Sequence, residues 1–293
     1  DVERSRGLGD VYKRQYYKEA GLDVDIIEPG DNATTSMVAA GKADFGISYQ
    51  EDVTYALTSE DPLPIKTIAT IIQHNTSGFV SLKSANINSV KDFEGKTYAG
   101  WGAPSEEAVI KAVMNEAGAD FSKLNIVGSD GSGIAGLSDE VSKNKVNLGW
   151  EFYGWAIIKA LQDGYDLNYM PLADLDNRLD YYTPVIITNK KMIKKNSDTV
   201  KKFMEATKKG YEYAIDHPSK AAEILHEDAL SDTDLKFLKE SQKYLSSQYA
   251  KDADSWGVMK DSVWDNYTDF MYETGLISQK IDAKDQYTNE FVK

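Results

Sequence analysis

Short apolar runs alternate with segments of helical periodicity along the chain from residue 16 onward. The apolar runs resemble buried strands, and the segments between them repeat apolar residues every three or four positions, as helices do. This alternation is the pattern of an α/β protein. Strands are predicted at residues 24–28, 43–48, 65–72, 78–82, 124–128, 146–150, 167–172 and 183–189, with a further strand ending near residue 100.

The helices are predicted from the same pattern and from their end signals. Pro104 suits the first position of a helix because a missing N–H costs nothing there, and Gly118 suits its end. A long helix is predicted from Ser197, and amphipathic helices from residue 219 to the C-terminus. Trp256, Trp264, Tyr267 and Phe270 have the spacing of one buried face. Shorter helices are predicted at residues 33–41, 51–59, 138–145 and 156–164.

Two polar, irregular stretches interrupt the alternation, at residues 86–97 and 173–180. Such stretches suit crossovers between domains. We therefore expect lobe I at residues 16–97 and 181–293 and lobe II at residues 98–180. A small ligand is expected in the cleft between these lobes, near the carboxyl ends of strands.

Residues 1–15 show no period that supports a helix or a strand. From Tyr16 the sequence resembles a helix end followed by the strand at residues 24–28. We expect residues 1–15 to be a non-native or disordered segment, and the fold to lack its first native strand.

The charge balance narrows the function. The chain has 33 Lys and Arg against 47 Asp and Glu, a net charge of −14. This argues against a nucleic-acid partner, which favours basic surfaces. There is no cysteine, which excludes disulfides, thiolate metal sites and cysteine nucleophiles. With three histidines, a His-rich metal site is not expected, although a carboxylate-only site stays open.

An aromatic stretch, LGWEFYGWA at residues 148–156, follows one predicted strand. Alternation in a strand sends neighbours to opposite faces, so Trp150, Phe152 and Tyr153 cannot all share one core. A second glycine-flanked tryptophan, Trp101, also follows a strand. We expect Trp101, Trp150 and Tyr153 to wall a site for a flat ring, with Glu151 as a polar neighbour, while burial in the core remains the alternative.

Other polar candidates lie at predicted element ends. Glu106 and Glu107 begin a helix, where either could hydrogen-bond a ring amine or only favour the helix dipole. Asn75 follows a strand and could hydrogen-bond a ligand. Tyr181 and Tyr182 lie at the second crossover, where they could cover a ligand or line a hinge.

Weaker motifs carry little. Gly131-Ser132-Gly133 resembles an anion-binding turn, but the phosphate motifs GxxxxGK[ST] and GxGxxG are absent. No GxSxG elbow accompanies the serines and histidines.

Three longer stretches resemble a known family. GKADFGIS at residues 41–48 resembles solute-binding proteins of ABC importers. YAGWGAPSEEAVIKAVM, WEFYGWAIIKA and DYYTPVIIT are similar to binding proteins for thiamine pyrimidine precursors, which share their fold with fungal pyrimidine-precursor synthases. The resemblance covers residues 16–293. It implies a two-lobed, type II periplasmic-binding-protein fold and a formylaminopyrimidine or hydroxymethylpyrimidine ligand between aromatic rings.

The resemblance also implies a biological setting. It implies a carrier without enzymatic activity or cofactor, working with an ABC permease and ATPase outside the cytoplasmic membrane, lipid-anchored and monomeric. Two departures stand out: the WTPN-like loop of the family is not found, and the cysteine-rich motif of the synthases is absent. An enzyme acting on a pyrimidine metabolite, or a carrier for an alkanesulfonate, remains an alternative.

Overall fold

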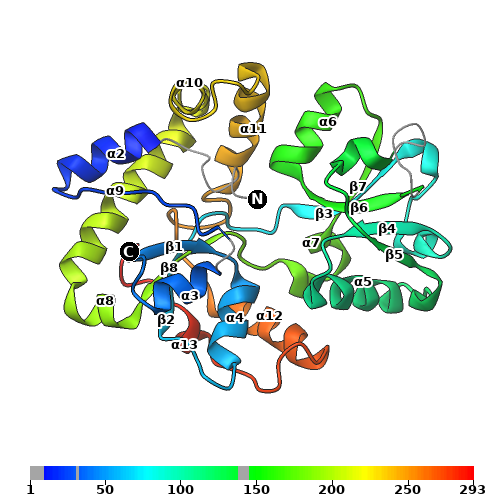
Figure 1. Cartoon of the computed structure of the whole chain (residues 1–293), viewed down its shortest axis with the longest axis horizontal. Helices are drawn as coiled ribbons and strands as arrows, with labels where there is room; N and C mark the ends of the chain where they lie inside the picture. Colours follow the sequence, from blue (N-terminus) through cyan, green and yellow to red (C-terminus); the bar gives the residue numbers. More distant parts are fainter. Residues whose placement is uncertain (1–9, 31–32, 138–144) are drawn as a thin grey trace. The chain divides into compact units, whose positions relative to one another are not determined.

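A computed structural model describes residues 10–30, 33–137 and 145–293. The described chain divides into two compact units (Figure 1). Unit 1 contains the described residues up to His74, together with Tyr181–Asp269 and Ile277–Lys293. Unit 2 contains Asn75–Asp180 and Phe270–Leu276. The chain therefore returns to unit 2 for one short segment near its C-terminus.

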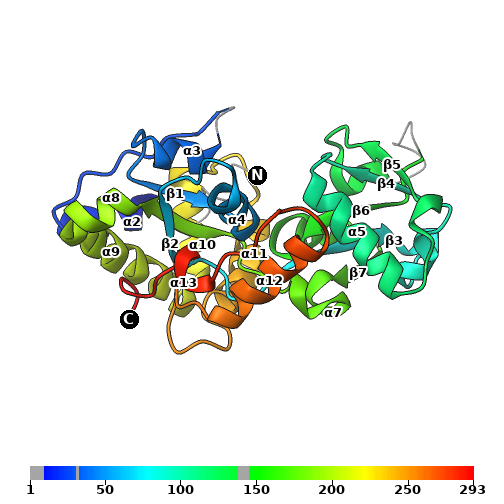
Figure 2. The same ribbon diagram turned by 90° about the horizontal axis from the view of Figure 1, so that it is seen from below.

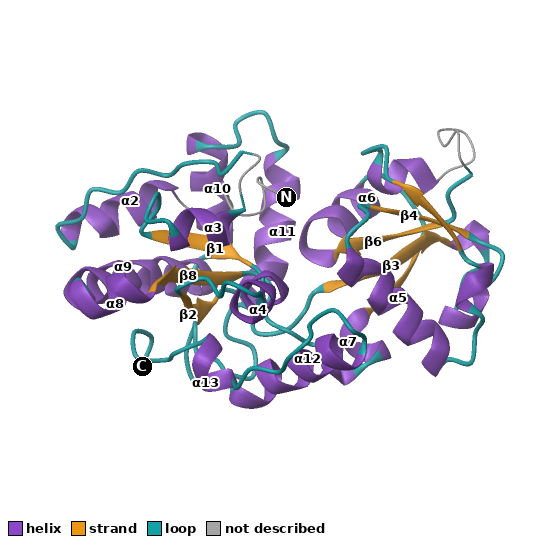
Figure 3. Cartoon of the chain, turned by 60° about the horizontal axis from the view of Figure 1, so that its bottom comes forward, coloured by secondary structure: helices purple, strands orange, loops and turns teal. Residues whose placement is uncertain are grey.

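Unit 1 is built on a sheet of strand order β1-β8-β2. β8 (Val185–Asn189) is central and pairs antiparallel with both β1 (Phe45–Ser48) and β2 (Ile65–Thr70). Helices flank this sheet (Figure 3). They are α2 (Asp10–Glu19), α3 (Thr34–Ala39), α4 (Gln50–Thr58), α8 (Lys190–Lys195), α9 (Ser197–Asp216), α10 (Pro218–Asp228), α11 (Leu235–Gln248), most of α12 (Asp261–Glu273), and α13 (Ala283–Gln286).

Helix α9 shows how the sequence pattern builds the core of unit 1. Its apolar stripe, which includes Val200, Met204 and Tyr211, is buried. The Tyr211 ring stacks on Trp256 with ring centroids 4.3 Å apart. On the other side of unit 1, α13 lies beside β2 (Figure 2), where Thr67 bridges to Tyr287. The C-terminal helices thus complete the core of unit 1 by packing with its sheet.

Unit 2 is built on a sheet of strand order β5-β4-β6-β3-β7. β4 (Thr97–Gly100) runs parallel to β5 (Asn125–Gly128) and to β6 (Leu148–Phe152). β3 (Ser77–Leu82) runs antiparallel to β6 and β7 (Leu167–Pro171). The helices of this unit are α5 (Pro104–Glu116), α6 (Ile158–Gln162) and α7 (Leu172–Leu175).

Two local predictions were wrong. Residues 24–28 are not assigned to a strand, and Ile26 and Ile27 are 50% and 55% exposed. An apolar run becomes a strand only where a sheet edge accepts its backbone. Residues 10–15, expected to be non-native or disordered, belong to α2, which packs along α9; the disordered alternative was wrong for them, and a non-native origin stays a prediction. Residues 1–9 and the predicted helix at 138–145, apart from Lys145, lie outside the described residues.

The observed boundaries also differ from the expected ones at two places, one of which is the segment Phe270–Leu276, expected in lobe I and found in unit 2. The chain enters unit 2 at Asn75 instead of residue 98, because β3 pairs with β6 and β7 and so belongs to their sheet. The return to unit 1 falls at Tyr181. In the described part of the chain, none of the helices is long and apolar enough to cross a membrane.

Candidate functional site

Two tryptophans meet at the carboxyl ends of adjacent strands in unit 2. β4 and β6 pair directly through Tyr98 and Leu148, so Trp101, just after β4, comes next to Trp150 in β6. The two indole rings lie with centroids 5.1 Å apart at an interplanar angle of 63°. Trp101 is 57% exposed, which is unusual for so large an apolar side chain.

Trp150 supports this exposed ring from below. Its own ring packs edge-on against the buried Phe79, with centroids 5.7 Å apart. Its indole Nε1 is buried and has no hydrogen-bond partner among the described residues. Trp150 is thus fixed on one side by the core while its partner Trp101 presents a face to solvent. We refer to these two side chains as the tryptophan wall.

Glu106 holds the loop that carries Trp101. Its buried carboxylate accepts hydrogen bonds from the Tyr98 hydroxyl at 2.5 Å and from the backbone N–H groups of Trp101 at 3.2 Å and Gly102 at 2.9 Å. Burial and then the charge of Glu106 raise the pKa of Tyr98 well above its usual range. Gly102 has a φ of +81°, a conformation that glycine adopts without strain.

The structure therefore separates the two acidic residues that the sequence left equivalent. The carboxylate of Glu106 is occupied by hydrogen bonds from Tyr98 and from the backbone of its own loop. Glu107, in the same first turn of α5, is exposed. Only Glu107 keeps a carboxylate open to solvent. The prediction that one of them contacts a ligand stays a prediction.

Glu151 and Tyr153 follow Trp150 along the chain and are half-buried. Glu151 lies close enough to Tyr98 for its charge to contribute to the raised pKa of that phenol. Tyr153 begins a π-helical turn, Tyr153–Ile157, and its ring meets that of Tyr169 with centroids 5.3 Å apart. Glu151 and Tyr153 thus lie in unit 2 and follow Trp150 closely in the sequence. The ring of Tyr153 packs against Tyr169, however, whereas that of Trp150 packs against Trp101 and Phe79.

Asn75, the first residue of unit 2, forms hydrogen bonds to the last residues of its main segment. Its backbone N–H donates to the Asp180 carboxylate at 2.9 Å, and its amide nitrogen donates to the Leu179 carbonyl at 2.8 Å. Its amide oxygen accepts from both the N–H and the hydroxyl of Ser77. Because Asn75 is buried and its amide is engaged on both sides, its observed role is structural, and ligand contact stays a prediction.

Tyr181 and Tyr182 lie in unit 1 and are both buried. Tyr182 is engaged in the fold: its N–H donates to the Gln50 side chain, and its hydroxyl accepts from the Lys260 N–H at 2.9 Å. Tyr181 stacks on Tyr267 with centroids 4.0 Å apart, and its hydroxyl donates to the Glu51 carboxylate. The two adjacent tyrosines therefore have different surroundings.

Glu51 is a titratable group that the sequence analysis did not single out. It lies in the first turn of α4, and burial, followed by the nearby charge of Asp52, raises its pKa to about 7. The sequence offered one signal, two consecutive acidic residues at the start of a predicted helix. Its tyrosine partner is distant in sequence, so the environment that shifts its pKa is a tertiary feature.

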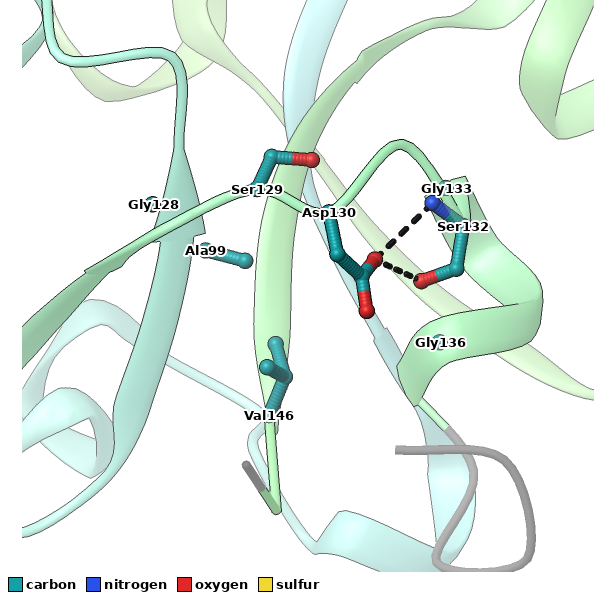
Figure 4. Close-up of a pocket in the computed structure, with 8 residues that line it drawn as sticks. All are labelled: Ala99, Gly128, Ser129, Asp130, Ser132, Gly133, Gly136 and Val146. Atoms are coloured by element: carbon teal, nitrogen blue, oxygen red, sulfur yellow. Dashed lines mark hydrogen bonds between the residues drawn. The ribbon is translucent and has the colours of Figure 1, made fainter. Parts of the chain in front are cut away.

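A small cavity lies near the carboxyl ends of β4 and β5 (Figure 4). The loop with the predicted anion-binding turn lines it, but the Asp130 carboxylate accepts from the Ser132 N–H at 2.9 Å and from its hydroxyl. The turn thus binds its own carboxylate, as Figure 4 shows. The lining residues are Ala99, Gly128, Ser129, Asp130, Ser132, Gly133, Gly136 and Val146.

Other polar groups give no indication of a metal. Within the described ranges, no group of three His, Asp or Glu side chains has the geometry to hold an ion. His74 lies 3.4 Å from the Asp252 carboxylate, both in unit 1.

Comparison with known proteins places this chain in a family. The family model described as "NMT1/THI5 like" matches residues 12–221. The chain belongs to the NMT1/THI5-like family. The formylaminopyrimidine-binding protein of Halalkalibacterium halodurans is 27% identical over 220 residues, which cover 72% of this chain and 62% of that protein. The chain therefore spans less than two thirds of that relative.

The relatives of this chain include synthases as well as binding proteins. The 4-amino-5-hydroxymethyl-2-methylpyrimidine phosphate synthase THI13 of Saccharomyces cerevisiae is 26% identical over 299 residues, covering 94% of this chain and 81% of the synthase. Both a binding protein and a synthase are thus among the relatives, as the resemblance implied.

A solved structure matches the fold. The sulfonate-binding protein SsuA of Methylobacillus flagellatus KT superimposes with a TM-score of 0.68 at 16% identity, covering 95% of this chain and 83% of SsuA. The predicted α/β, two-lobed periplasmic-binding-protein fold of type II is confirmed. At this identity the match establishes the fold and leaves the ligand open.

Proposed function

We propose that this NMT1/THI5-like chain is a solute-binding protein that captures a thiamine pyrimidine precursor of the formylaminopyrimidine or hydroxymethylpyrimidine type. The observation that carries the proposal is the tryptophan wall. An indole that is 57% exposed, and supported edge-on by a second indole, offers a fixed flat surface. Stacking of a heterocyclic base on such a ring contributes about 1–3 kcal/mol.

The charge around the wall supports an aminopyrimidine over a sulfonate. Glu107 and Glu151 lie within a few residues of the two tryptophans along the chain, and the nearby glycine-rich turn already holds the Asp130 carboxylate. Carboxylates accept hydrogen bonds from a ring amine and repel an anionic sulfonate. The named relative that binds formylaminopyrimidine supports the same ligand class.

A carrier role is favoured over catalysis. The synthase relatives make an enzymatic function the alternative. This chain has no cysteine, however, so the cysteine-rich motif of the synthase branch is missing. The further parts of the proposal are an ABC permease and ATPase as partners, a position outside the cytoplasmic membrane with a lipid anchor, and a monomeric state.

Calorimetry tests the proposal. Saturable heats are expected with formylaminopyrimidine and 4-amino-5-hydroxymethyl-2-methylpyrimidine, and none with taurine. The variant Trp101→Ala should weaken binding about 5- to 150-fold. Tyr272→Ala, another exposed aromatic of unit 2 at 44% exposure, is the matched control and should bind normally.

The outcomes separate the alternatives. Equal weak heats for all ligands would remove the pyrimidine assignment, and strong heat with taurine would replace it with a sulfonate carrier. Chemical conversion of the bound pyrimidine, followed by chromatography of the recovered ligand, would replace the carrier with an enzyme.

A further inference from the structure

Lysines are concentrated in one stretch of unit 1. Residues 190–209 contain eight lysines and two acidic residues, a net charge of +6 within a chain whose net charge is −14. The stretch forms α8 and the first part of α9, which are joined through Asn196 and lie in contact (Figure 1). The sequence analysis considered only the total charge and did not single out this stretch.

The packing of both helices turns these lysines outward. In α8, Met192 and Ile193 pack against the core of unit 1, and in α9 the buried stripe that includes Val200 and Met204 faces the same core. Lysines seven positions apart on α9 are about two turns apart, so they lie along one line of the helix surface. Seven of the eight lysines are exposed, and we refer to them as the lysine face: Lys190, Lys191, Lys194 and Lys195 of α8, and Lys201, Lys202 and Lys209 of α9.

The protein does not neutralise the lysine face itself. In the described part of the chain, none of its seven lysines forms an ion pair, whereas the eighth lysine, Lys208, lies 4.0 Å from the Glu212 carboxylate. The face borders a further cation, because burial and then the positive charge of Lys190 lower the pKa of Lys66 in β2. Like charges held close together repel one another. An anionic partner at this face would therefore relieve an unfavourable interaction.

We propose that the lysine face docks on a bilayer surface rich in anionic phospholipid. Each lysine close to such a surface strengthens the attraction about fivefold. The acidic remainder of the chain does not cancel this attraction, because charges more than about 8 Å from the bilayer are largely screened at physiological ionic strength. The inference goes beyond the proposed function, since no part of it depends on which solute the chain binds.

The chemistry of the face favours a bilayer over a nucleic acid. Residues 190–209 contain no arginine, the residue that binds single phosphates with two parallel hydrogen bonds. Phe203 is the one aromatic residue of the stretch and is buried, so the face offers no ring on which a base could stack. Met192 and Ile193 pack on the core. The contact is therefore made by charge, without insertion of apolar side chains.

Co-sedimentation with vesicles tests this inference. The full chain should bind vesicles with about 30% phosphatidylglycerol in phosphatidylcholine, and should not bind vesicles of phosphatidylcholine alone. Binding should be lost in about 1 M NaCl, where the Debye length is about 3 Å. Replacing the four lysines of α8 by glutamine should lower the partition coefficient by a factor of about 100 or more.

A matched variant makes the same change in charge elsewhere. It replaces four exposed lysines that are spread over both units and should bind phosphatidylglycerol vesicles within a few fold of the wild type. Its substitutions are Lys91→Gln, Lys111→Gln, Lys236→Gln and Lys243→Gln. Because all substituted side chains are exposed, both variants should melt within a few degrees of the wild type.

Acetylation of the wild type provides a second measurement that does not depend on the folding of a variant. When modified lysines are quantified by mass spectrometry, phosphatidylglycerol vesicles should protect Lys194 and Lys195. The same vesicles should leave the acetylation of Lys91 and Lys111 unchanged.

Several results would overturn this inference. Equal binding to both kinds of vesicle, no binding to either, or equal losses in the two variants would show that the lysine face is only a solvated surface. Tighter binding to a DNA duplex than to the vesicles, lost in the α8 variant, would replace the bilayer with a nucleic acid. None of these outcomes alters the heats expected with pyrimidines, so the proposed function is tested separately.

Discussion

The Trp101 indole rests edge-on against Trp150, with ring centroids 5.1 Å apart, while remaining 57% exposed. One face of the Trp101 indole thus stays exposed to water, which is energetically unfavourable, and the contact with Trp150 fixes the orientation of the ring. Isolated exposed apolar side chains are common, but one held by a second ring from an adjacent strand is preorganised for stacking.

The exposure of Trp101 predicts the quenching behaviour of the protein. Trp256 and Trp264 are buried, and Trp150 and Trp155 are half-buried, so acrylamide should quench mainly Trp101. Trp101→Phe should remove most of the quenchable fluorescence, and a bound pyrimidine should protect it in the wild type. Trp155→Phe serves as the control. Equal quenching of Trp101→Phe and the wild type would contradict the exposed position.

Glu106 and Glu107 should differ sharply in their contribution to stability. Glu106→Gln weakens three hydrogen bonds to a buried carboxylate and should lower the free energy of unfolding by about 1.5–3 kcal/mol. Glu107→Gln alters an exposed side chain and should change it by less than about 0.5 kcal/mol. Urea unfolding measures both, and similar losses would refute the assigned roles.

Gly100 should not tolerate a side chain, for a reason that its strand partner does not share. A Cβ at Gly100 would lie 2.3 Å from Glu106 Oε1, whereas a Cβ at Gly128, its register partner in β5, would meet nothing within 4 Å. Gly100→Ala should therefore displace Glu106 and cost about 1–3 kcal/mol. Gly128→Ala is the matched control in the same urea titration and should be close to neutral.

Glu51 should make the unliganded protein less stable as pH rises. Its pKa is raised from 4.5 to about 7 in the folded chain, so between these values the folded state binds more protons than the unfolded state. The free energy of unfolding then falls as pH increases through this window. Glu51→Gln should exceed the wild type in stability by at most about 3 kcal/mol at pH 8.

The comparison of the two proteins at about pH 3.5 provides the control for that experiment. Below the unfolded pKa of Glu51 both states carry the proton, and the difference between Glu51→Gln and the wild type should nearly vanish. A constant difference at both pH values would instead indicate a change in packing.

The sequence predicted the strands of the two sheets better than the boundary between the two units. Strands at residues 43–48, 65–72 and 183–189 appear as β1, β2 and β8, which pair in one sheet, and the apolar runs of β2 and β8 are buried. Residues 24–28 are also rich in apolar residues, but Ile26 and Ile27 are exposed and the segment is no strand. The entry into unit 2 was placed too late because the pairing of β3 with β6 is a long-range contact that periodicity does not encode.

For the site, the proximity of Trp101 and Trp150 was foreseeable, since both follow strands of one predicted lobe. The difference between Glu106 and Glu107 was also present in the sequence: Glu106 shares the buried helical stripe of Val109, Ile110 and Val113. Glu51 was not foreseeable from a local pattern, because an acid in a first helical turn usually serves the helix dipole alone.

The short return of the chain to unit 2 has a practical consequence. Arg178 forms charge-assisted hydrogen bonds to Asp176 and, at 2.7 Å, to Glu273, and its guanidinium lies over the Phe270 ring. A recombinant fragment that stops at Asp180 would lose Phe270 and Glu273 together. Anyone wishing to study the tryptophan wall in isolation should therefore splice residues 270–276 back onto the excised piece, or expect it to precipitate.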